Sequence, residues 1–165
     1  MSGTLRISAF ALVVAFLSCP ALAQNRLAEF RSRFQRETDP VHRAKVLPQL
    51  GTAQFQEIDK DLAADKLPDA LSVLQQYRDE AQSCAKALDA KSVNAEKHPS
   101  GFKELELSLR ESLRRLDDIL VSFPPDEQGA FRVVRNDLDE LDRHMIRELF
   151  PNQGDKDTHQ EKPRD

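Results

Sequence analysis

An apolar stripe between residues 71 and 88 constrains the fold of this chain more than any other feature. Apolar side chains recur there at steps of three and four, at Leu71, Leu74, Tyr77, Ala81, Cys84 and Leu88. This spacing places them on one face of an α-helix, whereas a half-buried strand alternates at every second residue. A helix with one apolar face has to bury that face against other elements.

The same periodicity extends over most of the chain, in which glycine is scarce. Short polar or proline-containing segments separate the stripes, as expected for helices joined by turns. We therefore predict an all-α fold, a bundle or short array of four to five amphipathic helices packed as antiparallel hairpins. The predicted helices cover residues 25–37, 40–64, 69–90, 102–123 and 126–149, with Asp65-Lys66-Leu67-Pro68 as the boundary before the third helix.

Local signals predict several helix ends. Asp39 followed by Pro40 is typical of an N-cap with proline at the first helical position. Pro48 falls inside the same helix and removes a backbone donor, which predicts a kink or short break just before it. Asp126 and Glu127 are expected in the first turn of the last helix, where the helix dipole favours negative charge.

The start of the chain has the three parts of a secretory signal peptide. Arg6 precedes an apolar run over 7–17, and Ala21-Leu22-Ala23 forms a small-x-small cleavage site. The run is shorter than the roughly 20 residues that a membrane-spanning helix needs. We predict a signal peptide over 1–23 and a location in the periplasm or outside the cell.

Cys19 raises an alternative, because a lipid could be attached to it. The preceding Phe16-Leu17-Ser18 is a poor lipidation box, so removal of Cys19 with the leader is favoured. Cys84 would then be the single cysteine, which excludes an intramolecular disulfide and leaves packing to stabilise the domain. We expect Cys84 to be a buried apolar residue rather than a reactive thiol.

The remainder divides into a helical domain over 24–150 and a disordered polar tail over 151–165, which contains no large apolar residue. The net charge of −4 gives no reason to expect nucleic acid or anionic lipid as a partner. No later stretch is apolar enough for stable membrane insertion after signal cleavage.

Two segments of the sequence resemble the tetratricopeptide unit. Leu50-Gly51 matches the Leu-Gly of its first helix, and Asp65-Lys66-Leu67-Pro68-Asp69-Ala70-Leu71 matches the turn that opens its second helix. Asp65 or Lys66 stands where the family has glycine, and no second copy follows. The resemblance implies a single elongated helical hairpin, with an ordinary helical hairpin as the alternative.

Two further resemblances concern function. Pro125-Asp126-Glu127-Gln128 is similar to the Thr-Pro-Glu-Gln segments of small helical periplasmic stress chaperones, although a helix start alone favours the same residues. The chain as a whole resembles a family of exported bacterial helical proteins of unknown function, through segments such as Gln76-Tyr77-Arg78-Asp79 and Gly101-Phe102-Lys103. That family implies no activity.

Motifs for catalysis or cofactor binding do not occur in the sequence, so we predict no catalytic residue, no cofactor, no metal and no enzyme activity. The histidines are scattered; Glu140 and His144 lie one helical turn apart, but charged helices produce such pairs by chance. The pairs Glu106–Arg110 and Glu111–Arg115 are predicted to form ordinary i,i+4 ion pairs.

The expected function is therefore an exported interaction or structural module that presents a helical groove to a protein or peptide of the cell envelope. A holdase-like periplasmic stress chaperone is the alternative, and an enzyme comes third. The sequence leaves the oligomeric state open. The candidate partner-binding residues are Leu71, Leu74, Tyr77, Arg78, Arg110 and Arg114.

Overall fold

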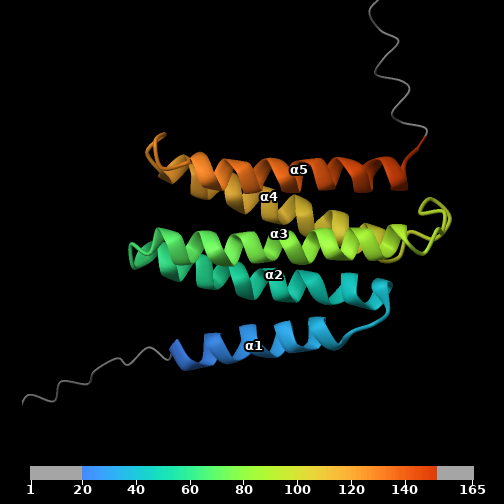
Figure 1. Cartoon of the computed structure of the whole chain (residues 1–165), viewed down its shortest axis with the longest axis horizontal. Helices are drawn as coiled ribbons and strands as arrows, with labels where there is room; N and C mark the ends of the chain where they lie inside the picture. The colour runs from blue at the N-terminus through green and yellow to red at the C-terminus, as the bar shows by residue number, and fades with distance from the viewer. Residues whose placement is uncertain (1–19, 152–165) are drawn as a thin grey trace, which may run out of the picture.

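A computed structural model describes residues 20–151, with side chains from Arg26 onward, and confirms the all-α fold. Most of the predicted signal peptide and nearly all of the predicted polar tail lie outside the described residues. The described part contains five helices (Figure 1). They are α1 (Pro20–Arg36), α2 (Pro40–Ala63), α3 (Leu67–Asp89), α4 (Phe102–Ser122) and α5 (Gly129–Leu149).

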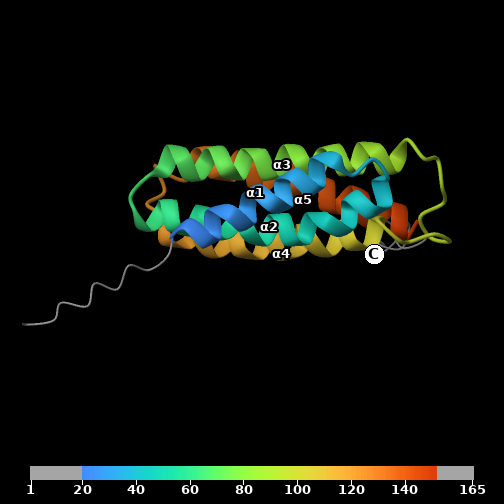
Figure 2. The ribbon, with the colours of Figure 1, turned by 90° about the horizontal axis from the view of Figure 1, so that it is seen from below.

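The helices form three layers. The α2–α3 hairpin lies in the middle, with the α4–α5 hairpin on one face and α1 on the opposite face (Figures 1 and 2). Successive helices run in opposite directions, so α2 and α4 are parallel neighbours, as are α3 and α5. α2 contacts α1, α3 and α4, and it is the helix through which α1 joins the array.

The core is built from the apolar stripes that the sequence predicts. In α3, the stripe from Leu74 to Leu88 is buried throughout, and only its first member, Leu71, keeps partial exposure. The leucine stripe of α4 is buried in the same way, as is the stripe of α5 from Phe131 to Leu149 except for the partly buried Leu141. The apolar faces therefore meet in one continuous core.

The helix ends follow capping rules. The Asp39 side chain accepts a hydrogen bond from the backbone N–H of His42 at 2.9 Å, which confirms the predicted N-cap of α2. At the start of α4, Gly101 has a φ of +90°, a conformation that favours glycine. Its backbone N–H donates to the Glu104 carboxylate at 2.6 Å.

Several predicted helix limits are wrong. The third helix begins at Leu67 and includes Pro68 in its first turn. The first helix begins at Pro20 rather than at residue 25. α2 runs through Pro48 as one helix, so the predicted alternative of a short break is wrong; the buried Leu47 and Leu50 hold both flanks in the core. α5 begins only at Gly129, so Asp126 and Glu127 lie in the preceding turn and not in the first turn of the helix.

Gln128 explains why the α4–α5 turn is closed. Its side-chain amide donates to the carbonyl oxygens of Leu120 at 2.9 Å and Phe123 at 2.7 Å, where α4 ends. Its carbonyl oxygen accepts from the Arg132 guanidinium, one turn into α5. The segment that resembles the stress chaperones therefore has a structural role in joining two helices.

Two neighbouring carboxylates, Glu106 of α4 and Asp142 of α5, differ in their partners. Glu106 is only 5% exposed and pairs with Arg110. Burial raises the pKa of Asp142, and the nearby charges of Glu106 and Asp139 raise it further, against the opposing effects of Arg110 and Arg143. One carboxylate oxygen of Asp142 is buried without a hydrogen-bond partner among the described residues.

Asp142→Asn is therefore expected to stabilise the protein at neutral pH. A raised pKa in the folded state means that the folded protein binds the proton more tightly than the unfolded chain. Asp142 therefore lowers the stability progressively as pH rises from the ordinary aspartate pKa toward the raised pKa of the folded state. The gain in melting temperature should shrink below the ordinary aspartate pKa of about 4. Thermal melts of wild type and Asp142→Asn at neutral pH and below about pH 4 measure this gain. Asp126→Asn, at an exposed position, is the control. Equal gains in melting temperature for Asp142→Asn at the two pH values would contradict the prediction.

Candidate functional site

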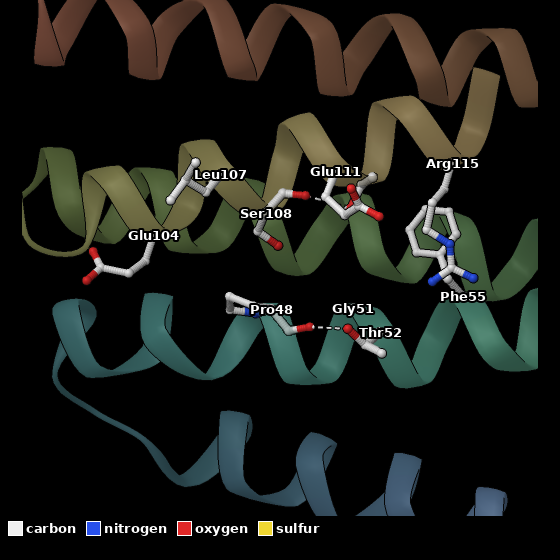
Figure 3. A pocket seen from close by; sticks show the side chains of 10 residues that line it. Pro48, Gly51, Thr52, Phe55, Glu104, Leu107, Ser108, Glu111 and Arg115 are labelled. Carbon is white, nitrogen blue, oxygen red and sulfur yellow. Dashed lines mark hydrogen bonds between the residues drawn. The ribbon is translucent and has the colours of Figure 1, made fainter. Parts of the chain in front are cut away.

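A groove with a volume of about 410 Å³ runs between α2 and α4 (Figure 3). It exists because two parallel helices meet here with small residues facing each other. Its floor is formed by Gly51 of α2 and by Ser108 and Ser112 of α4, all of them buried. Pro48, Phe55 and Leu107 contribute apolar surface along its length.

The ring of Tyr77 lies directly beneath this floor. A Cβ atom added at Gly51 would come within 2.8 Å of Cε2 of Tyr77, so glycine is what allows α3 and α2 to approach so closely here. The ring also meets Phe55 edge to face, with 5.6 Å between the centroids. Tyr77 therefore supports the groove from below without being exposed in it.

The hydroxyl of Tyr77 joins α3 to α4. It lies 3.3 Å from the carbonyl oxygen of Ser108, to which it donates, and 3.1 Å from the Ser108 hydroxyl. The Ser112 hydroxyl lies 2.7 Å from Tyr77 Oη and equally close to the Ser108 carbonyl oxygen. Burial raises the pKa of Tyr77, so this buried cluster stays uncharged at physiological pH.

One end of the groove is closed by Arg115. Its guanidinium carbon lies 4.7 Å from the centroid of the Phe55 ring, a cation–π arrangement that Figure 3 shows. The same guanidinium donates to Asp59 of α2 at 2.7 Å. The predicted Glu111–Arg115 pair is therefore wrong, and Glu111 pairs with Arg114 instead, whereas the predicted Glu106–Arg110 pair is confirmed.

The rim of the groove combines apolar and acidic side chains. Leu107 is 49% exposed, although the leucines on the other face of α4 are buried. Glu104 and Glu111 flank it along the same helix, and Thr52 faces them from α2 (Figure 3). An exposed leucine between carboxylates suits a ligand that combines an apolar side chain with a positive charge.

The apolar residues predicted to bind a partner lie elsewhere. Leu74 and Tyr77 are completely buried, and Leu71 packs against the core with partial exposure. Leu74 and Tyr77 cannot contact a partner in this conformation, because the faces of α3 that carry them are covered by the other helices. Their place in the stripe reflects packing.

The predicted arginines are on the surface but engaged. Arg78 bridges α3 to α5 through Asp137 at 3.1 Å and also contacts Asp79. Arg110 pairs with the buried Glu106 of its own helix. Arg114 binds Glu111 and Asp118 on the exposed face of α4. Arg114 reaches the rim of the groove only through Glu111, so the structure does not gather the six candidates into one site.

Sequence reasoning missed most of the groove. Leu107, Ser108 and Ser112 lie beside the leucine stripe rather than on it, and Pro48 was noted only as a helix breaker. The available signal was a pair of serines four residues apart on α4 opposite a glycine inside α2. That signal becomes meaningful only once α2 and α4 are known to be neighbours.

Comparison with protein-family models, with curated proteins and with solved structures finds no match for this chain. The groove therefore has to be interpreted from its own residues. None of the helices in the described part is both long and apolar enough to cross a membrane.

Metal ligands do not cluster among the residues that the structure describes: no group of three or more histidine, cysteine, aspartate or glutamate side chains could hold an ion. His144, considered above with Glu140, instead lies with Nε2 at 3.0 Å from an Asp89 carboxylate oxygen. This contact links α5 to the end of α3. His144 thus has a hydrogen-bond partner on a neighbouring helix.

Cys84 is buried, and burial raises the pKa of its thiol to about 12. The thiol is therefore uncharged at neutral pH and out of reach of reagents. We expect no modification by a methanethiosulfonate reagent in the folded protein and complete modification after unfolding. Mass spectrometry after short labelling times tests this, and rapid labelling without denaturant would contradict it.

Proposed function

We propose that this protein is an interaction module that binds a protein or peptide partner in the α2–α4 groove. The observation that carries the proposal is the exposed Leu107 beside a hollow whose floor is made of small residues. Exposed apolar side chains next to a concave surface are typical of sites that receive an apolar anchor of a partner.

The chemistry of the rim favours one kind of partner. Glu104 and Glu111 lie on either side of Leu107. Arg114 offsets the charge of Glu111 and Asp59 offsets that of Arg115, so the negative charge of Glu104 is left without a cation beside it among the described residues. A helix or extended segment that carries an apolar anchor followed by lysine or arginine would complement this surface. The predicted leader supports a partner in the cell envelope, which remains part of the proposal.

Site-specific photo-crosslinking tests the proposal. A photoreactive phenylalanine analogue at position 107 should capture a partner from envelope extract, whereas the same analogue at position 133 should not. Val133 is a matched control because it is 58% exposed but lies on α5, outside the residues that line the groove. Equal adducts from both positions, or none from position 107, would contradict the proposal.

The captured protein then allows a quantitative test. Leu107→Asp should weaken its binding by about tenfold or more, as expected for loss of a central apolar anchor, while Val133→Asp leaves binding unchanged. Circular dichroism shows whether both variants keep the fold. An adduct between two copies of this chain would assign the groove to self-association and overturn the proposal of a separate partner.

A further inference from the structure

α1 is attached to the rest of the protein differently from the other helices. It lies alone on the outer face of the α2–α3 hairpin and makes its backbone-level contacts with α2 only (Figures 1 and 2). Its apolar anchors are Leu27 and Phe34, which are buried, and Phe30, which is partly buried. From Arg26 onward, the face of α1 opposite these anchors is open to solvent.

The surface beneath α1 is unusually polar for a helix interface. Gln54 of α2 is completely buried and donates to the Glu80 carboxylate of α3 at 2.8 Å. Burial raises the pKa of Glu80, and the hydrogen bond from Gln54 and the charge of Arg31 offset only part of this rise. Arg31 of α1 donates to Gln76 of α3 at 2.7 Å. Arg43 of α2 stacks on the Phe34 ring, 5.3 Å from its centroid.

This interface is also incompletely satisfied. Four buried side-chain nitrogen or oxygen atoms lack a hydrogen-bond partner within the described residues, and three of them lie here: Nε of Arg31, Nε of Arg43 and Oε1 of Gln54. Native interfaces leave few such atoms, and each one weakens the packing that buries it. Arg43 also lines a hollow of about 530 Å³ between α2 and α3 that α1 does not fill.

The connection to α2 allows α1 to leave without unfolding its neighbour. α2 is capped by Asp39, whose side chain binds the His42 N–H and also pairs with Lys91 at 2.8 Å. These contacts fix the start of α2 independently of α1. Only residues 37–39 separate the two helices, so a rotation within this short segment is enough to release α1.

We propose that α1 is a displaceable cover, and that the α2–α3 surface beneath it is a docking site for a basic amphipathic helix of a partner protein. α1 itself defines the chemistry of that helix: large apolar residues at i, i+3 and i+7 and an arginine at i+4, as in Leu27, Phe30, Phe34 and Arg31. The arginine would donate to Gln76 of the docking site, as Arg31 does at 2.7 Å.

A partner helix displaces α1 because it can supply what α1 lacks. A donor placed opposite Gln54 would pair its unpartnered Oε1, and side chains that extend toward Arg43 would fill the hollow beside it. The α1 of a second copy would leave the same atoms unpaired and gains nothing over the covalently attached helix. This favours a different protein over a second copy.

A labelled peptide provides the probe. A fluorescein-labelled peptide of residues 24–37 should bind the wild-type protein weakly, since the attached α1 competes for the same surface. Phe34→Ala in the protein should strengthen peptide binding by about tenfold or more. The substitution removes one apolar anchor of the attached α1, so α1 competes less well with the peptide for the surface. Fluorescence anisotropy measures both. Equal affinities for wild type and Phe34→Ala would overturn the proposal.

Control variants separate this surface from the α2–α4 groove. Val133→Ala and Leu107→Asp in the protein should leave peptide affinity as in wild type, since both positions lie outside the surface that α1 covers. A peptide with Arg31→Ala should bind less well. If Leu107→Asp abolishes peptide binding, the peptide occupies the α2–α4 groove, and the proposal that α1 covers a docking site is wrong. That result would leave the proposed function of the groove untouched.

Hydrogen exchange of the wild-type protein gives an independent test that needs no variant. Amides of α1 should exchange at least about tenfold faster than those of α2–α5, because α1 opens without global unfolding. Equal exchange of α1 and α2 would overturn the proposal. Native mass spectrometry completes the set: a stable dimer that exchanges α1 between copies would assign the surface to a second copy and overturn the proposed partner.

Discussion

Tyr77→Ala should lower the free energy of unfolding by about 3–5 kcal/mol, the usual cost of removing a large aromatic side chain from a packed core. Tyr77 is completely buried, packs under the α2–α4 groove and links α3 to α4 through its hydroxyl. Its loss leaves a cavity at the place where the two hairpins meet. Urea unfolding followed by circular dichroism measures the change.

Tyr77→Phe separates packing from hydrogen bonding. It keeps the ring and removes only the hydroxyl, and the Ser112 hydroxyl retains the Ser108 carbonyl oxygen as an acceptor at 2.7 Å. We therefore expect a loss of only about 1 kcal/mol. A loss as large as that of Tyr77→Ala would show that the hydrogen-bond cluster, and not the ring, carries the stability.

Gly51→Leu should destabilise the protein by about 3 kcal/mol, at the upper end of the usual range for overpacking a core. A Cβ atom at this position already approaches the Tyr77 ring to 2.8 Å. The ring cannot move aside easily, because Phe55 meets it on one side and hydrogen bonds to Ser108 and Ser112 hold its hydroxyl. Chemical denaturation again gives the magnitude.

A double-mutant cycle tests whether Tyr77 is the cause. Gly51→Ala alone should be destabilising, since the close contact outweighs the roughly 1 kcal/mol by which alanine is favoured over glycine inside a helix. In a Tyr77→Leu background the ring is absent, so Gly51→Ala should become neutral or stabilising. The same destabilisation in both backgrounds would contradict the proposed contact.

The helices could be predicted from the sequence because their signals are local. The apolar stripe of α3 and the Asp39 cap of α2 each depend on a few neighbouring residues. The continuous course of α2 through Pro48 could not be predicted in this way, since it depends on how firmly the core holds Leu47 and Leu50.

The groove depends on contacts between helices that are distant in the sequence. The apolar spacing of α3 correctly predicts that Tyr77 lies on the apolar face of the helix. The same spacing also led to the prediction that Tyr77 binds a partner. Only the packing of α3 against α4 shows that its hydroxyl is satisfied by Ser108 and Ser112. Similarly, Arg115 had Glu111 available within its own helix and instead binds Asp59 of α2.

The order of the helices has a consequence for the speed of folding. Each helix packs on the next one in the chain. The contacts that join the α2–α3 hairpin to the α4–α5 hairpin are α3 with α4, α2 with α4 and α3 with α5, so no more than one helix lies between the partners in the sequence. Chains with such low contact order fold in roughly microseconds to milliseconds. A chain that reaches the envelope unfolded, as the proposed export implies, would thus spend little time with its apolar stripes open to proteases and to aggregation.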